Sequence, residues 1–461
     1  MLDVKTFEDL AASVRGEIIQ PGHPEYEEAR KVYNAMIDRR PRAIVRCADV
    51  ADVIASVNYA HDNGLLLAMR GGGHNVAGFG TCDDGLVLDF SRMKGIHVDP
   101  AKRTARAEAG VTWGDLDHAT HAFGLAAPGG VISTTGIAGL TLGGGIGYLS
   151  RKYGLSCDNL ISADVVTADG RLVTASEKEN QDLLWALRGG GGNFGVVVSF
   201  EYRLHPVNTV YAGPILWPLE KAAGAMRAYR DFMAGAPEDV NAFFAFLIVP
   251  PGDPFPQELH NKTLCGVVCC YTGDPAKAEK ALRPLREFGP PAFVHQGEMP
   301  FPMLQGLFDP LLQPGLQNYW KADFLADLSD EAIEAHVKYG PDIPTVNSAV
   351  HIYPVDGAAG RPGKNDTAWS YRDARYALVI AAIYPDPADT PKNMAWVRDY
   401  WNAVHPYSAG GAYINFMMDE GEERVAASYR ENYDRLVKLK GKYDRGNLFR
   451  MNQNIKPNGT S

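Results

Sequence analysis

The distribution of glycine limits the possible folds more than any other feature of this sequence. The chain of 461 residues contains 48 Gly, and they concentrate at residues 71–80, 129–147 and 189–195. Glycine lacks a Cβ and adopts positive φ angles at low cost, so such clusters mark places where the backbone approaches a ligand closely. A uniform excess of glycine would instead suggest disorder. We therefore expect a fold built around glycine-rich loops that hold a ligand.

Bulk composition excludes several classes of partner. The length suits two or three domains. The formal net charge is −10 and no block of Lys and Arg occurs, whereas binding to nucleic acid needs clustered positive charge. No apolar run reaches the roughly 20 residues that span a bilayer, and Met1–Phe7 lacks the pattern of a signal peptide. The six Cys show no disulfide framework, so we expect a reduced, cytoplasmic location.

Changes in composition along the chain predict four segments. Residues 1–37 have the pattern of an N-terminal helical segment, and residues 38–207 alternate short strands, helices and glycine-rich loops. Residues 208–409 are poorer in glycine and richer in aromatic residues. Their strands and amphipathic helices predict a sheet with helices on one face. Residues 410–461 form the last segment.

Individual elements follow from hydrophobic periodicity. Strands are expected in the third segment at 242–249, 264–271, 348–353 and 376–384. In the last segment we expect a strand at 412–416, followed by one long charged helix at 420–442.

The first glycine-rich loop has the composition of a phosphate-binding nest. A buried strand at 65–69 leads directly into Arg70-Gly71-Gly72-Gly73, whose successive N–H groups can point at one anion. Arg70 can add positive charge, although a surface ion pair is its simpler role. His74 follows at once and would be held beside the ligand. A metal ion is not expected, because no second His, Cys or carboxylate lies nearby at ligand spacing.

The second glycine-rich loop, residues 136–147, contains too many glycines for a helix or a stable strand. Apolar residues such as Ile137, Leu140 and Ile146 interrupt the glycines, which indicates a packed segment rather than a flexible surface loop. We therefore expect a rigid backbone cradle for a flat ring or a diphosphate.

A third motif, Gly190 to Gly195, matches the G-x-G-x-x-G spacing of a dinucleotide site. That fingerprint requires a strand before it and a helix after it. Here a helix at 182–188 precedes the motif and a strand at 196–200 follows it, so we reject a Rossmann-type NAD site.

Cys157 is the remaining candidate, in the loop Tyr153-Gly154-Leu155-Ser156-Cys157-Asp158-Asn159. From the residues alone it can be an inert thiol, a nucleophile or a point of attachment. No surrounding His, Asn or Asp pattern supports a cysteine protease. The motifs of serine hydrolases, P-loop NTPases and zinc proteases are absent.

Taken together, these motifs resemble the FAD-binding domain of the vanillyl-alcohol-oxidase superfamily, also called PCMH-type. The resemblance rests on Arg70–Asn75, the glycines at 143–147, and the stretches 152–159 and 185–195. The tail resembles the C-terminal segment of berberine-bridge enzymes through Tyr413-Ile414-Asn415-Phe416, Asn432-Tyr433, Tyr443-Asp444, Asn447–Arg450 and Asn452–Ile455. The resemblance is strong at 36–207 and 410–457, and the middle region matches only in layout.

The resemblance implies an α+β fold with a PCMH-type FAD-binding domain of two subdomains. The C-terminal segment completes that domain, and a separate substrate domain has an antiparallel sheet covered by helices. His74 matches the residue that bonds the flavin 8α carbon, and Cys157 matches the residue that bonds flavin C6. These matches place the chain in the subgroup with two covalent bonds to FAD. Val165 resembles the position that controls access of oxygen.

Further cofactor contacts are expected from the same motifs. The full set of residues expected to bind FAD is Arg70, Gly71, Gly72, Gly73, His74, Asn75, Gly78, Thr135, Gly136, Gly139, Thr141, Gly143, Gly144, Cys157, Val197, Asn415, Asn452 and Asn454.

The catalytic base is where this chain departs from the pattern. Relatives that oxidise carbohydrates carry Tyr-x-Asn-Tyr in the tail, and the final tyrosine resembles a proton acceptor. Here that position is Phe416, which has no hydroxyl. Tyr413, Asn415 and Tyr384 remain as candidate catalytic residues. The change weakens the carbohydrate hypothesis and leaves room for amines or for phenolic or polyketide-like alcohols.

The leading hypothesis is an FAD-dependent oxidase with two covalent flavin bonds. It would transfer hydride from an alcohol or amine C–H of a bulky small molecule to flavin N5, and O2 would reoxidise the flavin to give H2O2. Three alternatives stay open: a tailoring enzyme that performs oxidative cyclisation on a secondary metabolite, a flavin dehydrogenase with another electron acceptor, and a protein that holds FAD without catalysis. The sequence does not specify the substrate or the oligomeric state.

Overall fold

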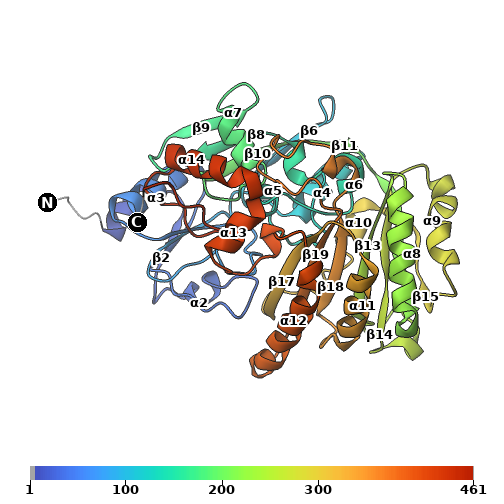
Figure 1. Cartoon of the computed structure of the whole chain (residues 1–461). Helices are drawn as coiled ribbons and strands as arrows, with labels where there is room; N and C mark the ends of the chain where they lie inside the picture. The colour runs from blue at the N-terminus through green and yellow to red at the C-terminus, as the bar shows by residue number, and fades with distance from the viewer. Residues whose placement is uncertain (1–5, 460–461) are drawn as a thin grey trace.

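Three β-sheets of four, five and eight strands carry the fold of the computed structural model, which describes residues 6–459 (Figure 1). A two-stranded pair, β7 (Leu125–Ala126) with β11 (His205–Pro206), lies apart from them. The structure contains helices together with parallel and antiparallel strand pairs, so the expected α+β class is confirmed.

The four-stranded sheet comes from the N-terminal part of the chain. Its order is β1 (Glu17–Ile19), β2 (Ala43–Arg46), β4 (Leu86–Asp89) and β3 (Leu67–Arg70). Strands β2, β3 and β4 are parallel, and helix α3 (Val50–Asp62) connects β2 to β3. Strands β2 and β4 are largely buried, as is typical of parallel strands that are covered on both faces.

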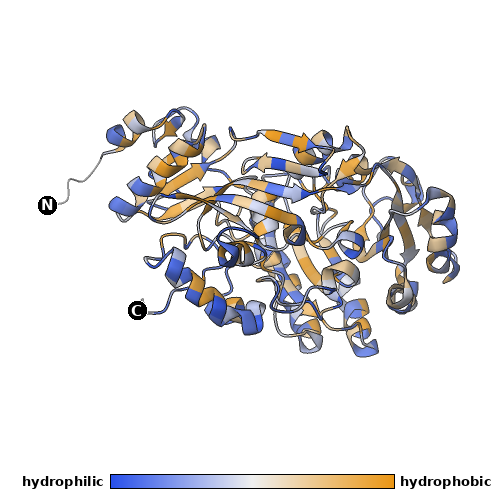
Figure 2. Ribbon diagram, turned by 90° about the horizontal axis from the view of Figure 1, so that it is seen from above, coloured by the Kyte–Doolittle hydropathy of each residue, from blue (hydrophilic) through white to orange (hydrophobic). Residues whose placement is uncertain are grey.

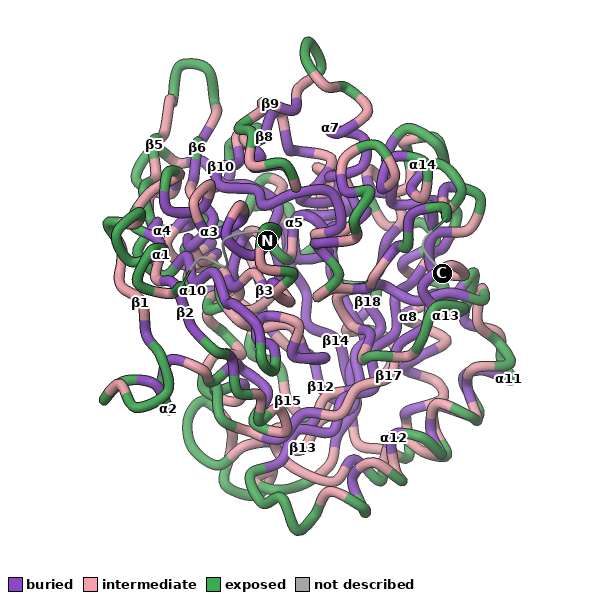
Figure 3. Tube along the Cα trace, turned by 90° about the vertical axis from the view of Figure 1, so that its left-hand side faces the viewer, coloured by how far each residue is buried: buried purple, intermediate pink, exposed green. Residues whose placement is uncertain are grey.

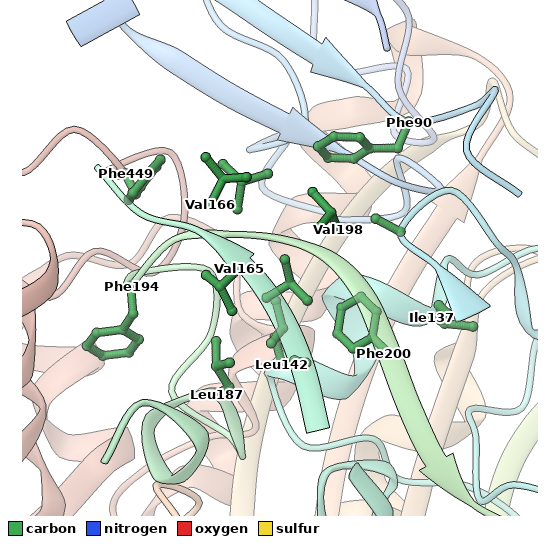
Figure 4. Close-up of a cluster of buried hydrophobic side chains, with 14 of the residues drawn as sticks. Phe90, Ile137, Leu142, Val165, Val166, Leu187, Phe194, Val198, Phe200 and Phe449 are labelled. Carbon is green, nitrogen blue, oxygen red and sulfur yellow. The ribbon is translucent and has the colours of Figure 1, made fainter. Parts of the chain in front are cut away.

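The five-stranded sheet is antiparallel and follows the first sheet in the chain. Its order is β5 (Ile96–Asp99), β6 (Thr104–Glu108), β10 (Val196–Arg203), β8 (Leu160–Val166) and β9 (Leu172–Ser176). Side chains of β8 and β10 enter a core shared with the neighbouring helices (Figure 4). The helices around this sheet are α4 (Trp113–His121), α5 (Ile137–Leu142), α6 (Ser150–Tyr153) and α7 (Gln181–Leu187).

Helix α5 corrects one expectation, since we had excluded a helix from residues 136–147. Only Gly139 lies inside the helix, and Gly136 and Gly143 are its caps. The buried residues Ile137 and Leu142 anchor the turn in the core, and this packing outweighs the low helix propensity of glycine.

The third sheet is the largest and is antiparallel. Its order is β15 (Phe293–Val294), β12 (Thr209–Pro218), β14 (Thr263–Tyr271), β13 (Val240–Ile248), β18 (Ala349–Pro354), β19 (Tyr376–Tyr384) and β17 (Gln317–Leu325), and β16 (Gly297–Pro300) also pairs with β12. Helices α8 (Ala222–Gly235), α9 (Ala278–Glu287), α11 (Asp330–Tyr339) and α12 (Thr390–Val404) cover one face, and the short α10 (Phe301–Gln305) contacts α4 (Figure 1).

The two faces of this sheet bury different sets of side chains. Strand residues such as Val350, Ile352 and Ile380 pack under the helices. Their neighbours Tyr353, Val379 and Ala381 pack on the opposite face, toward the glycine-rich loops. Figure 2 shows the hydrophobic residues concentrated on the strands, and Figure 3 shows α11 and α12 with exposed outer turns over buried strands.

The two ends of the chain differ from expectation. The N-terminal segment contains α1 (Phe7–Ser13), β1 and α2 (Tyr26–Ala29), and residues 1–5 lie outside the described part. In the tail, the strand expected at 412–416 is a 3-10 turn at Ile414–Phe416. The expected long helix is split into α13 (Glu422–Tyr429) and α14 (Tyr433–Tyr443) by a 3-10 turn.

The tail packs against the N-terminal half of the chain as well as against the large sheet. Figure 1 shows α14 beside α7. The Nδ2 of Asn193 donates to the carbonyl of Gln453 (3.1 Å), and the N–H of Ile455 donates to Asn193 Oδ1 (2.9 Å). Lys440 and Asp444 form a fully buried ion pair at 2.6 Å, and Lys440 also donates to the Asn193 carbonyl. The tail therefore closes the structure formed by residues 38–207.

Candidate active site

One large cavity lies where the two glycine-rich loops, the tail and the free face of the large sheet meet. Its empty volume is about 1860 Å³, part of which opens to solvent. Both glycine-rich loops, the tail and the free face of the large sheet contribute residues to its lining.

The glycines bring the two loops into direct contact. A Cβ added at Gly72 would lie 2.8 Å from the Cα of Gly136 and closer still to its nitrogen. A Cβ at Gly71 would lie 2.8 Å from the carbonyl oxygen of Ala109. No side chain fits at these positions, so the backbone itself forms this wall of the cavity.

His74 lies on that wall, at the edge of the first loop. Its Nε2 is 2.9 Å from Thr134 Oγ1, and its Nδ1 is 3.4 Å from Thr135 Oγ1. The ring stacks on Tyr33 at a centroid distance of 4.1 Å. Burial lowers the pKa of His74 to about 4, so the imidazole is neutral at neutral pH. A neutral ring keeps the nitrogen lone pair that a bond to carbon requires.

Arg70 also lines the cavity, but its charge is already balanced. Its Nη2 donates to Asp89 Oδ2 at 2.9 Å, and both side chains are buried. Its Nη1 donates to the carbonyl of Lys31. Arg70 therefore fixes the end of β3 against β4, where its carboxylate partner lies.

Tyr413 and Asn415 belong to the tail and close the second loop. The N–H of Gly145 donates to the Tyr413 hydroxyl oxygen (2.8 Å), as does Asn415 Nδ2 (2.7 Å). Asn415 Nδ2 also donates to the carbonyl of Leu140 (3.0 Å). Both lone pairs of the Tyr413 oxygen are thus in use, which makes it a poor acceptor for a substrate proton.

Tyr384 does not face the cavity, contrary to expectation. Its side chain is fully buried on the helix-covered face of β19, and its hydroxyl donates to Thr390 Oγ1 at 3.1 Å. The alternate residues Val379, Ala381 and Ile383 are the ones that line the cavity. Successive strand residues point to opposite faces of the sheet, and Tyr384 lies on the face away from the cavity.

Cys157 lies behind the second loop and not on the cavity wall. Its N–H donates to the carbonyl of Gly144, and its thiol lies 3.7 Å from Asp158 Oδ1. Arg372 pairs with Asp158 at 2.6 Å and lies beside the thiol, and its Nε has no hydrogen-bond partner among the described residues. Burial, reinforced by Asp158, raises the pKa of the Cys157 thiol, whereas Arg372 opposes this change.

Val165 also lies away from the cavity. It packs in the core among Leu142, Leu187 and Phe194 (Figure 4). A Cβ at Gly195 would collide with Val165, so this residue supports the loop that lines the cavity and does not border the open space itself.

All the residues expected to form the site, including those described above, divide into two groups. Those that line the cavity are Arg70, Gly71, Gly72, Gly73, His74, Asn75, Thr135, Gly136, Gly139, Val197, Tyr413, Asn415 and Asn452. Those that do not are Gly78, Thr141, Gly143, Gly144, Cys157, Val165, Tyr384 and Asn454. Within the second group, Tyr384 lies on the helix-covered face of the large sheet.

The residues present fit an FAD molecule. Gly71, Gly72, Gly73 and Gly136 expose backbone along the cavity, and the Oδ1 atom of the lining residue Asn452 is buried without a partner in the part of the chain that the structure describes. An amide oxygen of this kind can accept a hydrogen bond from a ligand N–H or O–H. Asn452 Nδ2 is held by the carbonyls of Gly192 and Phe449, so its oxygen is fixed in direction.

The wall formed by the large sheet and the segment before β17 was not predicted. Phe308, Leu312 and Trp320 form it together with His351 and Tyr353 of β18. His351 Nδ1 lies 2.6 Å from the Tyr353 hydroxyl. Alternation in the expected strand at 348–353 places both on one face, and this was the signal that could have identified them.

Two searches of the structure bear on other classes of site. Among residues 6–459, no three or more His, Cys, Asp and Glu side chains are grouped so that they could hold a metal ion. Within the same residues, no helix has the length and apolar character needed to cross a membrane.

Comparison with known proteins agrees with the geometry. The family described as FAD binding domain matches residues 41–176, and the family described as berberine and berberine like matches residues 412–456. An FAD-linked oxidoreductase of Dictyostelium discoideum is 32% identical over 456 residues, which cover 97% of this chain and 96% of that protein.

Two further similarities concern oxidases. A xylooligosaccharide oxidase of Thermothelomyces thermophilus is 28% identical and covers 94% of this chain and 90% of its own length. The crystal structure of 6-hydroxy-D-nicotine oxidase from Arthrobacter nicotinovorans superposes with a TM-score of 0.86 at 29% identity, covering 98% of this chain and all of that structure.

Proposed function

The chain belongs to the berberine-bridge-enzyme-like family of FAD-linked oxidoreductases, and from this premise we propose that it is an oxidase that retains its FAD through covalent bonds to His74 and Cys157. The bound flavin supplies the hydride acceptor and passes two electrons to O2, which gives H2O2. The protein binds and orients the substrate and accepts its proton.

The observation that carries this proposal is the position of His74. It lies on the cavity wall beside the glycine cradle, and burial lowers its pKa to about 4. Stacking on Tyr33 and contact with Thr134 fix the ring in one orientation. A neutral, immobilised imidazole at the edge of a flavin-sized space is suited to forming a bond to carbon.

The bond to Cys157 rests on a weaker combination of features. The thiol is close enough to the cavity residue Tyr413 for their charges to interact. The guanidinium of Arg372 lies beside the sulfur and has an unused Nε–H. This N–H can stabilise a thiolate, the form of cysteine that reacts.

The substrate class follows from the wall opposite the glycine loops. Phe308, Leu312, Trp320 and Phe416 make that wall largely apolar, and the cavity-lining residues within the described chain include no Asp, Glu or Lys. A bulky, neutral aromatic alcohol or amine suits this surface. The similarity to 6-hydroxy-D-nicotine oxidase supports this class.

Three other functions remain as candidates. Carbohydrate oxidation draws support from the similarity to xylooligosaccharide oxidase, but a sugar needs more hydrogen-bonding groups than this wall offers. An oxidative cyclisation of a secondary metabolite uses the same apolar wall and the same flavin. The reduced flavin of a dehydrogenase would be reoxidised slowly in air.

Intact-protein mass under denaturing conditions tests the attachment. We expect wild type, His74→Ala and Cys157→Ala to carry FAD after denaturation, and the double variant to lose it. Cys265→Ala removes another buried thiol, in β14, and is the matched control that should keep both bonds. Unmodified mass for wild type with release of yellow flavin would contradict covalent attachment.

H2O2 release in air then separates the functions. Screening of aryl alcohols and arylalkylamines should give H2O2 together with bleaching of the flavin under anaerobic conditions. Anaerobic bleaching followed by slow recovery in air would support the dehydrogenase instead. Activity confined to oligosaccharides would contradict the proposed substrate class.

A further inference from the structure

We propose that Tyr353 and His351 form the proton-accepting pair of this enzyme: the Tyr353 hydroxyl takes the proton of the substrate O–H or N–H and passes its own proton to Nδ1 of His351. This inference rests on the proposed oxidation of an alcohol or amine. It assigns a role that the sequence motifs did not indicate and that the tail residues of the cavity do not fill.

Strand β18 places the two side chains on the cavity. Its residues alternate, so that Val350 and Ile352 pack under the helices while His351 and Tyr353 line the open space. The residue paired with His351 on β13 is Ala245, a small side chain. The small Ala245 side chain leaves the imidazole uncovered on that side of the sheet face.

The pair is joined by a short hydrogen bond. The Tyr353 hydroxyl lies 2.6 Å from His351 Nδ1, and aromatic rings of Phe243 and Phe308 surround the imidazole at centroid distances of 4.8 and 5.6 Å. Burial lowers the pKa of His351 to about 3 and raises that of Tyr353. The imidazole is therefore neutral, and in the proposed tautomer the neutral tyrosine donates to the Nδ1 lone pair.

Three other polar side chains of the cavity are already committed or cannot accept a proton. The Tyr413 oxygen accepts from Gly145 and Asn415, and Arg70 is paired with Asp89. Trp320 donates its Nε1–H to Asn318 and can accept no proton. On the sheet wall of the cavity, as far as the described residues show, only His351 and Tyr353 can take up a proton.

Their place next to Phe416 strengthens the assignment. The Tyr353 and Phe416 rings lie 5.8 Å apart, and Phe416 in turn packs edge-on against Tyr413 at 4.8 Å. Phe416 has no hydroxyl, so the tail offers no acceptor at this point. Tyr353 provides one from the facing sheet, across the same part of the cavity.

The proposed step balances as follows. The substrate C–H bond breaks, and its electron pair leaves with the hydrogen as hydride to the flavin, while the O–H or N–H bond electrons form the new C=O or C=N bond. The released proton goes to the Tyr353 oxygen, and the original Tyr353 proton goes to His351 Nδ1. A weak base is sufficient, because the substrate proton becomes strongly acidic as positive charge develops on carbon.

A matched pair of probes separates this role from a structural one. Benzyl alcohol must lose a hydroxyl proton, whereas the neutral form of N,N-dimethylbenzylamine has no O–H or N–H proton to lose. Because this amine is mostly protonated at neutral pH, its rates are compared per neutral amine over a range of pH. We expect Tyr353→Phe and His351→Gln to slow anaerobic flavin reduction by benzyl alcohol about 10²–10⁴-fold in the limiting rate, with little change in apparent Kd. Reduction by the tertiary amine should stay at the wild-type rate.

Tyr400→Phe is the matched control. Tyr400 and His336 form the same kind of buried bond, with the hydroxyl 2.8 Å from Nδ1, under the helices on the far side of the sheet. This variant should reduce with both probes as wild type does. Equal slowing of both probes by Tyr353→Phe would show that Tyr353 only maintains the fold, and wild-type rates with benzyl alcohol would overturn the proposal.

A second readout does not depend on turnover. In protein labelled with ¹⁵N in histidine rings, His351, assigned with His351→Gln, should show an unprotonated Nδ1 that accepts a hydrogen bond at pH 7, and Tyr353→Phe should remove the hydrogen-bond shift. A protonated Nδ1 would overturn the proposal. If neither probe reduces wild-type flavin, the proposed substrate class fails, and these spectra alone decide whether the pair exists.

Discussion

Replacement of Lys440 by Met tests how the tail is held. Lys440 Nζ donates three hydrogen bonds, to Asp444 Oδ2 (2.6 Å), to the Asn193 carbonyl (2.9 Å) and to the Phe449 carbonyl (2.8 Å). Both members of the ion pair are fully buried. Met has a similar length but no charge, so Lys440→Met leaves a buried carboxylate and two carbonyls without this donor.

The structure sets the magnitude of the loss. Removal of one partner from a buried ion pair costs about 3–5 kcal/mol. Asp444 still accepts the N–H groups of Leu448 and Phe449, each at 2.8 Å, which offsets part of the loss. We therefore expect a decrease in the free energy of unfolding of about 3 kcal/mol, and a fall in Tm of about 3 °C for a chain of this length. The double variant Lys440→Met with Asp444→Asn should recover part of the lost free energy of unfolding.

Urea unfolding followed by tryptophan fluorescence, together with release of the tail to a protease, measures the effect. Lys442→Met is the control two residues away, since Lys442 pairs with Asp182 at the surface with a side chain 56% exposed. An exposed pair contributes about 0–1 kcal/mol. If Lys440→Met were no less stable than Lys442→Met, the buried pair would not hold the tail, and the reasoning would be refuted.

Two other predictions concern the loops and a buried acid. Gly72→Ala should lower the ratio of bound flavin to protein, measured by absorbance, because its Cβ would push Gly136 away. Gly441→Ala, in α14 and away from the cavity, would place its Cβ with no atom within 4 Å and should bind flavin normally. Burial raises the pKa of Asp117 to about 7, so its protonated form stabilises the native state below about pH 4, and this stabilisation is lost as pH rises to 7. Relative to Asp117→Asn, wild type should lose about 1.4 kcal/mol per pH unit across that range in urea unfolding, and parallel pH profiles for the two proteins would contradict this.

The sequence predicted much of the fold because its signals were local. The glycine-rich loops, strand β19 and the order of helix and strand around Gly190–Gly195 all depend on residues close together in the chain. The prediction failed where tertiary packing decides. Helix α5 exists because Ile137 and Leu142 are buried, and the tail segment at 412–416 forms a turn rather than a strand.

The site was harder to predict, for a physical reason. All nine residues of β19 are buried, so hydrophobicity does not show which face is toward the cavity, and Tyr384 was placed on the wrong one. Arg372, which lies beside the Cys157 thiol, is 215 positions later in the chain, and no local pattern reveals this neighbour. His351 was missed because its partner and its cavity are both defined only by the assembled sheet.

The fastening of the tail to Asn193 also sets an order of events during synthesis. The partners Asn193, Lys440 and Gln453 are separated by the whole of the large sheet in the chain. At about 5–20 residues per second, the ribosome needs roughly 10–50 s to pass from one to the other. During that interval the glycine-rich loops have been synthesised, but the tail residues that complete the cavity wall have not. Flavin capture is therefore a step that follows translation, and a chain stalled before residue 440 should be unable to load its cofactor.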